Sequence, residues 1–546
     1  MSFVRIFPGG GVVSSRIGIA VGRLLTLVVS LLPCVSAARA ADDRQVVPFN
    51  KERQIVRLNI VATDHHGEPV NDLASSDLQI SDEGTVEQIL YFRRIDRVPG
   101  PPAALAPNEI SNRTAATIPH ATVILLDLMN EQFNTRAYAA HELTRYLQSL
   151  ESADYLYLYL LTIDGRILPV HGLDAEQQPG GRTVGDSGQR SARESSEPWT
   201  KDSKRLIDQA INAAVRAGSA NLTAGTRIEW TLKALGAIAA ALAHVPGRKN
   251  IVWLTDGAPI QIGAAQSDNG QFIDLAPAVR QLSLALERFQ VAIYPVQMIT
   301  IGSSQILPQR PETSSGNRSS AGLHSTETLD QLAAITGGRP TSSKDVRGAV
   351  AQAMNDARTN YDVGYAPPDT NWDGKFHKLR VTTRRKGIRI QAKSGYYASP
   401  QSRTQRSLEA IRPVAANAMD ASEIGIRGSI SSVPGARDTS RIDAAIDATD
   451  VLTIDDGDRH ETSLMAAILT YRPGPQGTTL TAIPPLIPVD TRPPSQSGES
   501  AKSPIHFTRD ISLAGGAIAV RIIIYDEYGG KLGSLTFRRS GTASPQ

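Results

Sequence analysis

The sequence predicts an α/β protein in which a doubly wound domain, built on a mostly parallel sheet, is flanked by β-sandwich-like domains. Two observations predict this fold class. In the middle of the chain, apolar strand-like runs alternate with helical stretches, whereas toward both ends strand-like pieces follow one another without long amphipathic helices. The length of 546 residues exceeds the roughly 250 to 300 residues at which a single hydrophobic core stops growing, so several domains are expected.

The first 40 residues are typical of a secretory signal peptide, with four arginines, no acidic residue and an apolar run over 24–32. A membrane-spanning helix needs about 20 apolar residues, and Arg23 interrupts the run that comes nearest to this length. We expect cleavage after Ala40, export to the periplasm or the cell surface, and no stable membrane span in the mature chain. Removal of 1–40 also removes Cys34, the single cysteine, and changes the formal charge from +3 to −1 because the four arginines leave.

Residues 45–97 are predicted to form a small antiparallel β-sandwich, or part of one. Apolar side chains alternate over 55–62, and a turn rich in polar residues follows. His65 and His66 lie in this turn, where neighbouring side chains point apart, so we interpret them as turn residues and not as a metal pair. Residues 98–119, rich in proline and alanine, are predicted to form a linker.

Residues 120–400 are predicted to form the α/β domain. Strands are expected at 122–126, 155–162, 167–170, 250–255, 291–296 and 361–365. Helices are expected at 135–150, 203–217, 228–244, 275–289, 326–336 and 343–359. Strands that alternate with helices of this length predict a mostly parallel sheet with helices on both faces. A terminal β-hairpin is expected over 377–383 and 387–393.

Residues 401–546 are predicted to form a second β-sandwich. Its strand-like pieces lie at 442–448, 464–471, 505–513 and 518–525. No long amphipathic helix is expected in this part, and a proline-rich loop at 484–504 interrupts the strands. Asp455–Asp458 has the acidic residues of a calcium loop but lacks their spacing and the terminal glutamate, so we expect a solvated turn there.

Two acidic residues directly follow apolar strands of the predicted parallel sheet. Asp127 follows the strand at 122–126, and Asp256 follows the strand at 250–255. In open α/β sheets ligands collect outside the carboxyl ends of the strands, so both carboxylates are expected to face one crevice. A hard cation such as Mg²⁺ takes oxygen ligands, usually one or two carboxylates with hydroxyls and waters. The sequence therefore makes this edge of the sheet the candidate site.

Several segments together resemble the von Willebrand factor type A domain, and within it the secreted bacterial group often called acidobacterial von Willebrand factor A-related proteins. The segments that carry the resemblance are Val123–Asp127, Thr231–Ile238, Pro246–Gly257, Leu329–Gly338, Tyr361–Tyr365, Gly374–Arg380 and Ser394–Tyr396. The resemblance covers about 45–400. It implies a Rossmann-like fold whose functional site is a metal-ion-dependent adhesion site on loops at the carboxyl ends of the strands.

The sequence departs from this family at the first metal-binding motif, Asp-x-Ser-x-Ser. Asp127 matches the motif, but Met129 replaces the first serine and Glu131 replaces the second. A thioether is a poor ligand for Mg²⁺. Glu131 or Asn130 is a candidate to restore an oxygen ligand. In the alternative interpretation, Asp127 is a strand-end residue whose carboxylate bonds the amides of the following loop.

The later family motif is better preserved. Asp256 matches its last position, and either Thr223 or Thr226 stands where the family places a loop threonine. The resemblance therefore implies a degenerate Mg²⁺ site on Asp127, Glu131 and Asp256, with the alternative that Asp256 simply forms a turn.

Charge and motifs limit the function classes. With 57 Lys and Arg against 54 Asp and Glu, the chain cannot build the positive field that nucleic-acid binding needs. It has no Gly-x-Ser-x-Gly, His-Glu-x-x-His or phosphate-binding glycine loop. We therefore expect an exported, non-enzymatic protein that binds another protein or a cell-surface polymer through the strand-end face. Two alternatives stay open: a periplasmic or cell-surface hydrolase with its site in the carboxyl-terminal third, and a structural spacer.

Overall fold

The structure, a computed structural model, describes most of the chain that follows the predicted signal peptide. The described residues are 54–95, 104–114, 120–130, 141–147, 155–171, 205, 208–209, 212–213, 224–255, 264–266, 272–274, 276–297, 329–339, 345–368, 371–436, 438–456, 459–474, 477–480, 482–491, 503–513 and 516–538. The predicted signal peptide, 1–40, lies outside them. No helix in this described part is long and apolar enough to cross a membrane.

A five-stranded, mostly parallel sheet forms the centre of the α/β part. In spatial order its strands are β12 (Val291–Gln297), β9 (Lys249–Thr255), β6 (Ala121–Asp127), β7 (Leu156–Leu161) and β8 (Ile167–His171). Neighbouring strands are parallel except β7 and β8, which form an antiparallel pair. Every residue of β6 and β9 is buried, as expected for strands that are covered on both faces. The predicted mostly parallel sheet is confirmed for these strands.

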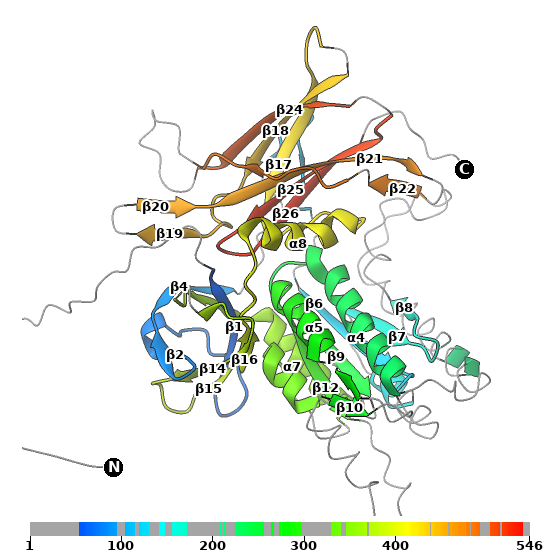
Figure 1. Cartoon of the computed structure of the whole chain (residues 1–546), viewed down its shortest axis with the longest axis vertical. Helices are drawn as coiled ribbons and strands as arrows, with labels where there is room; N and C mark the ends of the chain where they lie inside the picture. Colours follow the sequence, from blue (N-terminus) through cyan, green and yellow to red (C-terminus); the bar gives the residue numbers. More distant parts are fainter. Residues whose placement is uncertain are drawn as a thin grey trace, which may run out of the picture. The chain divides into compact units, whose positions relative to one another are not determined.

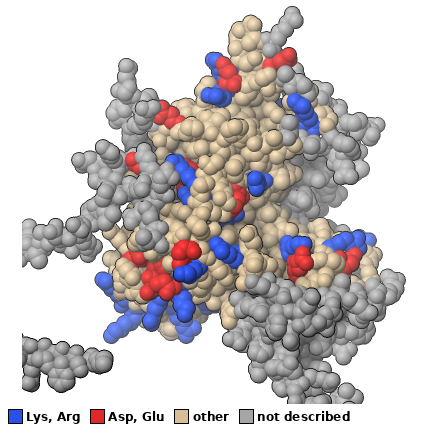
Figure 2. All heavy atoms as spheres, viewed as in Figure 1, with Lys and Arg blue, Asp and Glu red and all other residues tan. Residues whose placement is uncertain are grey.

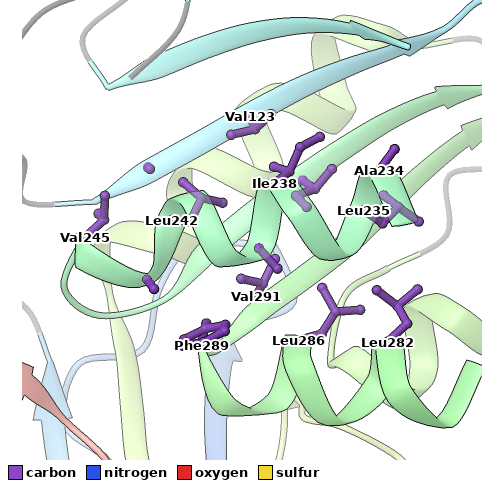
Figure 3. Close-up of a cluster of buried hydrophobic side chains, with 14 of the residues drawn as sticks. Val123, Ala234, Leu235, Ile238, Leu242, Val245, Leu282, Leu286, Phe289 and Val291 are labelled. Carbon is purple, nitrogen blue, oxygen red and sulfur yellow. The ribbon is translucent and has the colours of Figure 1, made fainter. Parts of the chain in front are cut away.

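One face of this sheet is covered by α4 (Ala224–Ala241) and α5 (Ala276–Arg288) (Figure 1). Their apolar side chains form one buried cluster with those of the strands. Figure 3 shows part of the cluster, with Ile238 of α4 beside Val123 of β6, and Leu286 on α5. Apolar side chains that recur every three or four residues on both helices provide this face.

The opposite face of the sheet is covered by α7 (Val346–Arg358) and by the helical residues 141–147. Val350 of α7 and Leu143 pack with Ile124 of β6 in a second buried cluster. Helices therefore cover both faces of this sheet. A short antiparallel pair, β10 (Ala264–Gln266) and β11 (Phe272–Asp274), lies between β9 and α5 in the chain.

Two four-stranded antiparallel sheets form a sandwich, named here the amino-terminal sandwich after its first strands. One sheet has the order β15 (Arg389–Gln391), β1 (Val56–Thr63), β13 (Asn360–Tyr365) and β4 (Ile89–Ile95). The other has the order β16 (Gly395–Tyr397), β14 (Phe376–Thr383), β2 (Leu78–Asp82) and β3 (Thr85–Glu87). Leu58, Ile80 and Val363 contribute to its buried core, so residues of both sheets pack on one another.

Two predictions for this part of the chain are wrong. The strand at 361–365 does not extend the parallel sheet, because β13 pairs with β1 and β4. The segments 377–383 and 387–393 do not form a hairpin, because β14 pairs with β2 and β16 whereas β15 pairs with β1. The strands themselves were expected. Their partners β1, β2 and β4 lie roughly 300 residues away in the chain, and apolar alternation does not identify a partner.

The carboxyl-terminal part, together with β5, forms a second sandwich. One sheet has the order β24 (Ile505–Ser512), β18 (Thr439–Ile446), β17 (Ile426–Ser432) and β5 (Ile110–Ser111). The other has the order β22 (Gly477–Leu480), β21 (Leu464–Gly474), β25 (Ala519–Asp526) and β26 (Leu532–Arg538). Three shorter strands, β19 (Thr453–Asp456), β20 (Arg459–Thr462) and β23 (Ile487–Pro488), pair locally. Ile442 and Ile522 bring the two sheets into one core.

The linker prediction for 98–119 is wrong at its centre, because Ile110–Ser111 is β5 and pairs with β17. The next residue, Asn112, is buried. Its side-chain amide donates to the carbonyl oxygen of Ala421 (2.7 Å), and its Oδ1 accepts from the backbone N–H of Ile426 (2.8 Å). A short polar segment that bonds to a distant backbone has the composition of a linker, so the sequence does not distinguish the two.

The helix α8 (Arg403–Ala416) contradicts the prediction that 401–546 contains no long amphipathic helix. It begins at Ser402, whose hydroxyl accepts from the backbone N–H of Gln405 (3.3 Å). Its buried side chains have helical spacing: Ser407, Ala410, Ile411, Val414 and Ala415. This face joins the cluster that also contains residues of α4, β21 and β25. Small side chains and the internal Pro413 obscure the pattern in the sequence.

Candidate functional site at the carboxyl edge of the parallel sheet

The carboxyl ends of the parallel strands form one edge of the sheet, named here the carboxyl edge. The chain order of the strands reverses between β6 and β9, because β7 and β8 extend the sheet on one side and β9 and β12 on the other. Asp127 ends β6, and Thr255 ends β9. The Thr255 hydroxyl donates to Asp127 Oδ2 (3.2 Å), so the two strand ends meet. Open α/β sheets bind ligands at such reversal points.

Five protein donors surround the carboxylate of Asp127. Its Oδ1 accepts from the backbone N–H groups of Met129 (3.1 Å) and Asn130 (3.0 Å). Its Oδ2 accepts from the Asn130 side-chain amide (2.8 Å), the Trp253 indole N–H (3.0 Å) and the Thr255 hydroxyl (3.2 Å). The two oxygens of a carboxylate offer about four lone-pair sites, so these donors satisfy it fully.

Asn130 links the loop after β6 to α4. Its Nδ2 donates both to Asp127 Oδ2 and to Thr231 Oγ1 (2.7 Å). The Thr231 hydroxyl in turn donates to the carbonyl oxygen of Arg227 (2.8 Å), one helical turn earlier. An amide oxygen turned toward the carboxylate would be repelled, so the charge of Asp127 fixes this orientation. As a result Asn130 Oδ1 is buried without a hydrogen-bond partner among the described residues.

Burial raises the pKa of the Asp127 carboxyl above its ordinary value, although the hydrogen bonds from Asn130, Trp253 and Thr255 counteract this effect. The side chain has no exposed surface. A carboxyl group enclosed in this way cannot reach a substrate. What the cluster does is hold the loop after β6 against α4 and β9.

Only one of the three predicted metal ligands, Asp127, lies within the described residues. Three expected ligand positions lie outside them: Glu131, Asp256 and Thr223. Thr226 lies in the first turn of α4. Met129 is buried in the apolar cluster under α4 and α5, where its thioether is a core side chain. Within the part of the chain that the structure describes, no group of three His, Cys, Asp or Glu side chains could hold a metal ion.

The turn between β7 and β8 is an exposed part of the carboxyl edge that sequence reasoning did not single out. Arg166 Nε and Asp164 Oδ2 form an ion pair (2.6 Å) on its surface. Gly165 has a φ of +77° and lies against the ring of Trp230 on α4, where a Cβ atom would overlap the ring. A short polar turn carries no signature of its own. Its place at the edge follows from the antiparallel pairing of β7 with β8.

A second buried carboxylate, Asp82, lies inside the amino-terminal sandwich. Its Oδ2 accepts from the hydroxyls of Tyr365 (2.9 Å) and Tyr396 (2.9 Å), and its Oδ1 lies 3.4 Å from His377 Nδ1. Burial raises the pKa of both tyrosines, so they stay protonated and act as donors. Because Tyr365 belongs to one sheet and Tyr396 to the other, the cluster ties the two sheets together.

Charged side chains of both signs are mixed on the face of the molecule shown in Figure 2. Lys and Arg lie beside Asp and Glu, and areas without charged side chains separate these groups. On this face, recognition by the described residues therefore depends on local groups of side chains and not on one broad field.

A comparison with protein-family models finds no match, and a comparison with curated proteins finds none either. The function is therefore inferred from the chain's own residues.

Proposed function

We propose that this chain is an exported, non-enzymatic interaction protein whose von Willebrand A-like domain binds another protein or a cell-surface polymer at the carboxyl edge. The observation that carries the proposal is the meeting of Asp127 and Thr255 at the reversal point between β6 and β9. Counted along the chain from β6, the strand order is 5-4-1-2-3, which supports the Rossmann-like fold that the resemblance implies.

The enclosed state of Asp127 favours binding over catalysis. A catalytic carboxyl must come within hydrogen-bond reach of the substrate, whereas this one is buried and satisfied by protein donors. The same bonds fix three elements of the carboxyl edge relative to one another: the loop after β6, the end of β9 and, through Thr231, α4. Loops held on a rigid scaffold are the usual place for recognition.

Side chains suited to contact a partner lie on the turn between β7 and β8. Arg166 and Asp164 are both well exposed, with 81% and 49% of their side-chain surface in solvent. The half-buried Trp230 supports this turn from α4. Arginine and tryptophan are the residue types that most often dominate the energy of protein interfaces.

The proposal assigns Asp127 a structural role in place of a metal-binding role. A cation at this carboxylate would have to displace at least one of its protein donors. Calorimetric titration with Mg²⁺, Mn²⁺ and Ca²⁺, on the native chain and on Asp127→Ala, tests this assignment. We expect no heat that depends on Asp127. Saturable heat that disappears in the variant would instead support the Mg²⁺ site on Asp127, Glu131 and Asp256.

The binding surface is tested by charge reversal at two matched positions. Arg166→Glu changes the carboxyl edge, and Arg441→Glu changes an exposed arginine that pairs with Asp510 in the carboxyl-terminal sandwich. The immobilised mature chains are exposed to the exported proteins and surface polymers of the producing cell, and each captured component is quantified. We expect at least one component to be lost with Arg166→Glu and kept with Arg441→Glu. A capture profile that is the same for both variants would contradict the proposal.

A further inference from the structure

A cavity of about 190 Å³, lined mainly by charged side chains, lies at the end of the amino-terminal sandwich. One water molecule has a share of about 30 Å³ in the liquid, so the cavity has room for a small polyatomic ligand. Its lining includes Arg57 on β1, Arg93 on β4 and Asp362 on β13 between them. Lys531 and Arg113 join them from outside the sandwich. This cavity is separate from the carboxyl edge.

The strand register brings the two sandwich arginines to one carboxylate. Arg93 is directly opposite Asp362, and Arg57 is opposite Gly364, two residues further along β13. The Asp362 Oδ2 lies 3.3 Å from Arg93 Nη2 and 3.8 Å from Arg57 Nη2. The other oxygen, Oδ1, accepts from the Tyr91 hydroxyl (3.0 Å). Two guanidinium groups therefore share a single carboxylate oxygen.

The other charged side chains of the lining have hydrogen-bond partners of their own, and Arg94 Nη1 donates to the carbonyl oxygen of Asn71 (2.7 Å). Arg113 donates to the carbonyl oxygens of Ser422 and Glu423 and forms an ion pair with Asp450 (2.9 Å). The carboxylate of Glu423 accepts from two backbone N–H groups, those of Gly247 (3.2 Å) and Leu532 (3.3 Å). The lining thus carries five cationic side chains, Arg57, Arg93, Arg94, Arg113 and Lys531, against the three carboxylates of Asp362, Glu423 and Asp450, and so keeps a net positive charge. Lys531 Nζ donates to the carbonyl oxygen of Asp450 (2.9 Å), which uses one of its three hydrogens.

Both sandwich arginines also keep an unused donor. Arg57 Nε and Arg93 Nε are buried and have no hydrogen-bond partner among the described residues. Buried donors of charged groups are rarely left unpaired, because the loss of water is then not compensated. Burial, together with the nearby Arg93, lowers the pKa of Lys531 to about 8. An anion in the cavity would accept hydrogen bonds from the unused Nε donors and would stabilise the charged form of Lys531.

We propose that this cavity binds a small oxyanion of the phosphate class, held by Arg57, Arg93 and Lys531. The planar forks of two arginines donate in pairs to tetrahedral or planar oxyanions, and the lysine adds a compact point charge. Gly530 leaves room for this arrangement, because a side chain there would overlap the Arg57 guanidinium. The site goes beyond the proposed interaction function and does not depend on it.

The test measures the melting temperature of the full mature chain as a function of inorganic phosphate concentration, with sodium chloride added to keep the ionic strength constant. A ligand that binds the folded state raises the melting temperature in a saturable way. We expect the melting temperature to rise and reach a plateau with phosphate and with sulfate, and not to rise with acetate. A phosphate monoester, glycerol 3-phosphate, is tested beside inorganic phosphate. If the natural ligand is a phosphate group carried on a larger molecule, the monoester should bind more tightly than inorganic phosphate. If the natural ligand is free phosphate, it should not.

Variants locate the site. Arg93→Gln and Lys531→Gln each remove one proposed contact, and each is expected to weaken phosphate binding by roughly tenfold or more. Arg385→Gln, which removes an exposed arginine paired with Asp72 in the same sandwich, serves as the matched control and is expected to bind as the native chain does. Circular dichroism without anion checks that each variant is folded. The proposal would be overturned if Arg93→Gln and Lys531→Gln bound phosphate as well as the control Arg385→Gln does. It would also be overturned if the melting temperature of the native chain rose only with ionic strength.

Discussion

The substitution Asp127→Asn tests whether the carboxylate at the end of β6 holds the carboxyl edge together. The amide keeps the shape of the side chain but only one acceptor oxygen. The Oδ1 position faces two backbone N–H groups, and the Oδ2 position faces the fixed Trp253 N–H, so wherever the new NH₂ lies, it leaves at least one buried donor unpaired. At the Oδ2 position the Thr255 hydroxyl and the Asn130 amide can turn to accept. Each buried donor left unpaired costs about 1 to 3 kcal/mol, and relief of the buried charge offsets part of this. We expect a loss of about 1 to 3 kcal/mol in the free energy of unfolding.

Urea denaturation followed by tryptophan fluorescence measures this loss, because Trp253 itself donates to Asp127. The midpoint should fall while the slope of the transition stays unchanged. Asp164→Asn is the control, since that carboxylate is half exposed, and its stability should change by no more than about 0.5 kcal/mol. A loss below about 1 kcal/mol for Asp127→Asn, or an equal loss for both variants, would refute the structural role assigned to Asp127.

Three further predictions concern the packing of the fold and its titration. Ile411→Ala on α8 opens a cavity in the cluster shared with α4 and should lower the free energy of unfolding, measured in urea, by about 2 to 5 kcal/mol. A decrease of less than about 1 kcal/mol would show that α8 does not pack there. Burial lowers the pKa of His244 from its ordinary value of 6.5 to about 4. As the pH drops, the unfolded chain therefore takes up this proton before the folded chain does. The free energy of unfolding should fall by about 2 to 3 kcal/mol between pH 6.5 and pH 4. His244→Gln should remove that part of the fall, and an identical pH profile would contradict the assignment. Gly165→Ala, at a positive φ and against Trp230, should cost about 1 to 3 kcal/mol and shift the tryptophan emission; an unchanged spectrum and midpoint would exclude this contact.

The parallel sheet could be predicted from the sequence because its strands are continuous apolar runs. Every residue of β6 and β9 is buried, as expected for strands that are covered on both faces. The β13 strand could not be assigned to its sheet. Its alternation fits any half-buried strand, and its partners, β1 and β4, are contributed by a segment near the start of the chain.

The sequence predicted that Asp127 lies at the end of a strand, but not which side chains surround it. Asp127 was expected at the strand end, because the run before it is apolar. Its partners Trp253 and Thr255 come from β9, and Thr231 comes from α4, so only the fold brings them together. The two sandwich arginines of the oxyanion cavity were not singled out at all, because an arginine on a strand carries no signature of its own and only the register places them beside Asp362.

The central claim is that the carboxyl edge is the binding face, and site-specific photo-crosslinking tests it most directly. A benzophenone side chain is placed at Arg166, on the turn between β7 and β8, or at Arg441 in the carboxyl-terminal sandwich, and the cells that export the protein are irradiated. Both positions are exposed, so both probes are free to react. We predict a discrete adduct from position 166 and none of the same mass from position 441. The same adduct at both positions, or an adduct from position 441 alone, would contradict the claim.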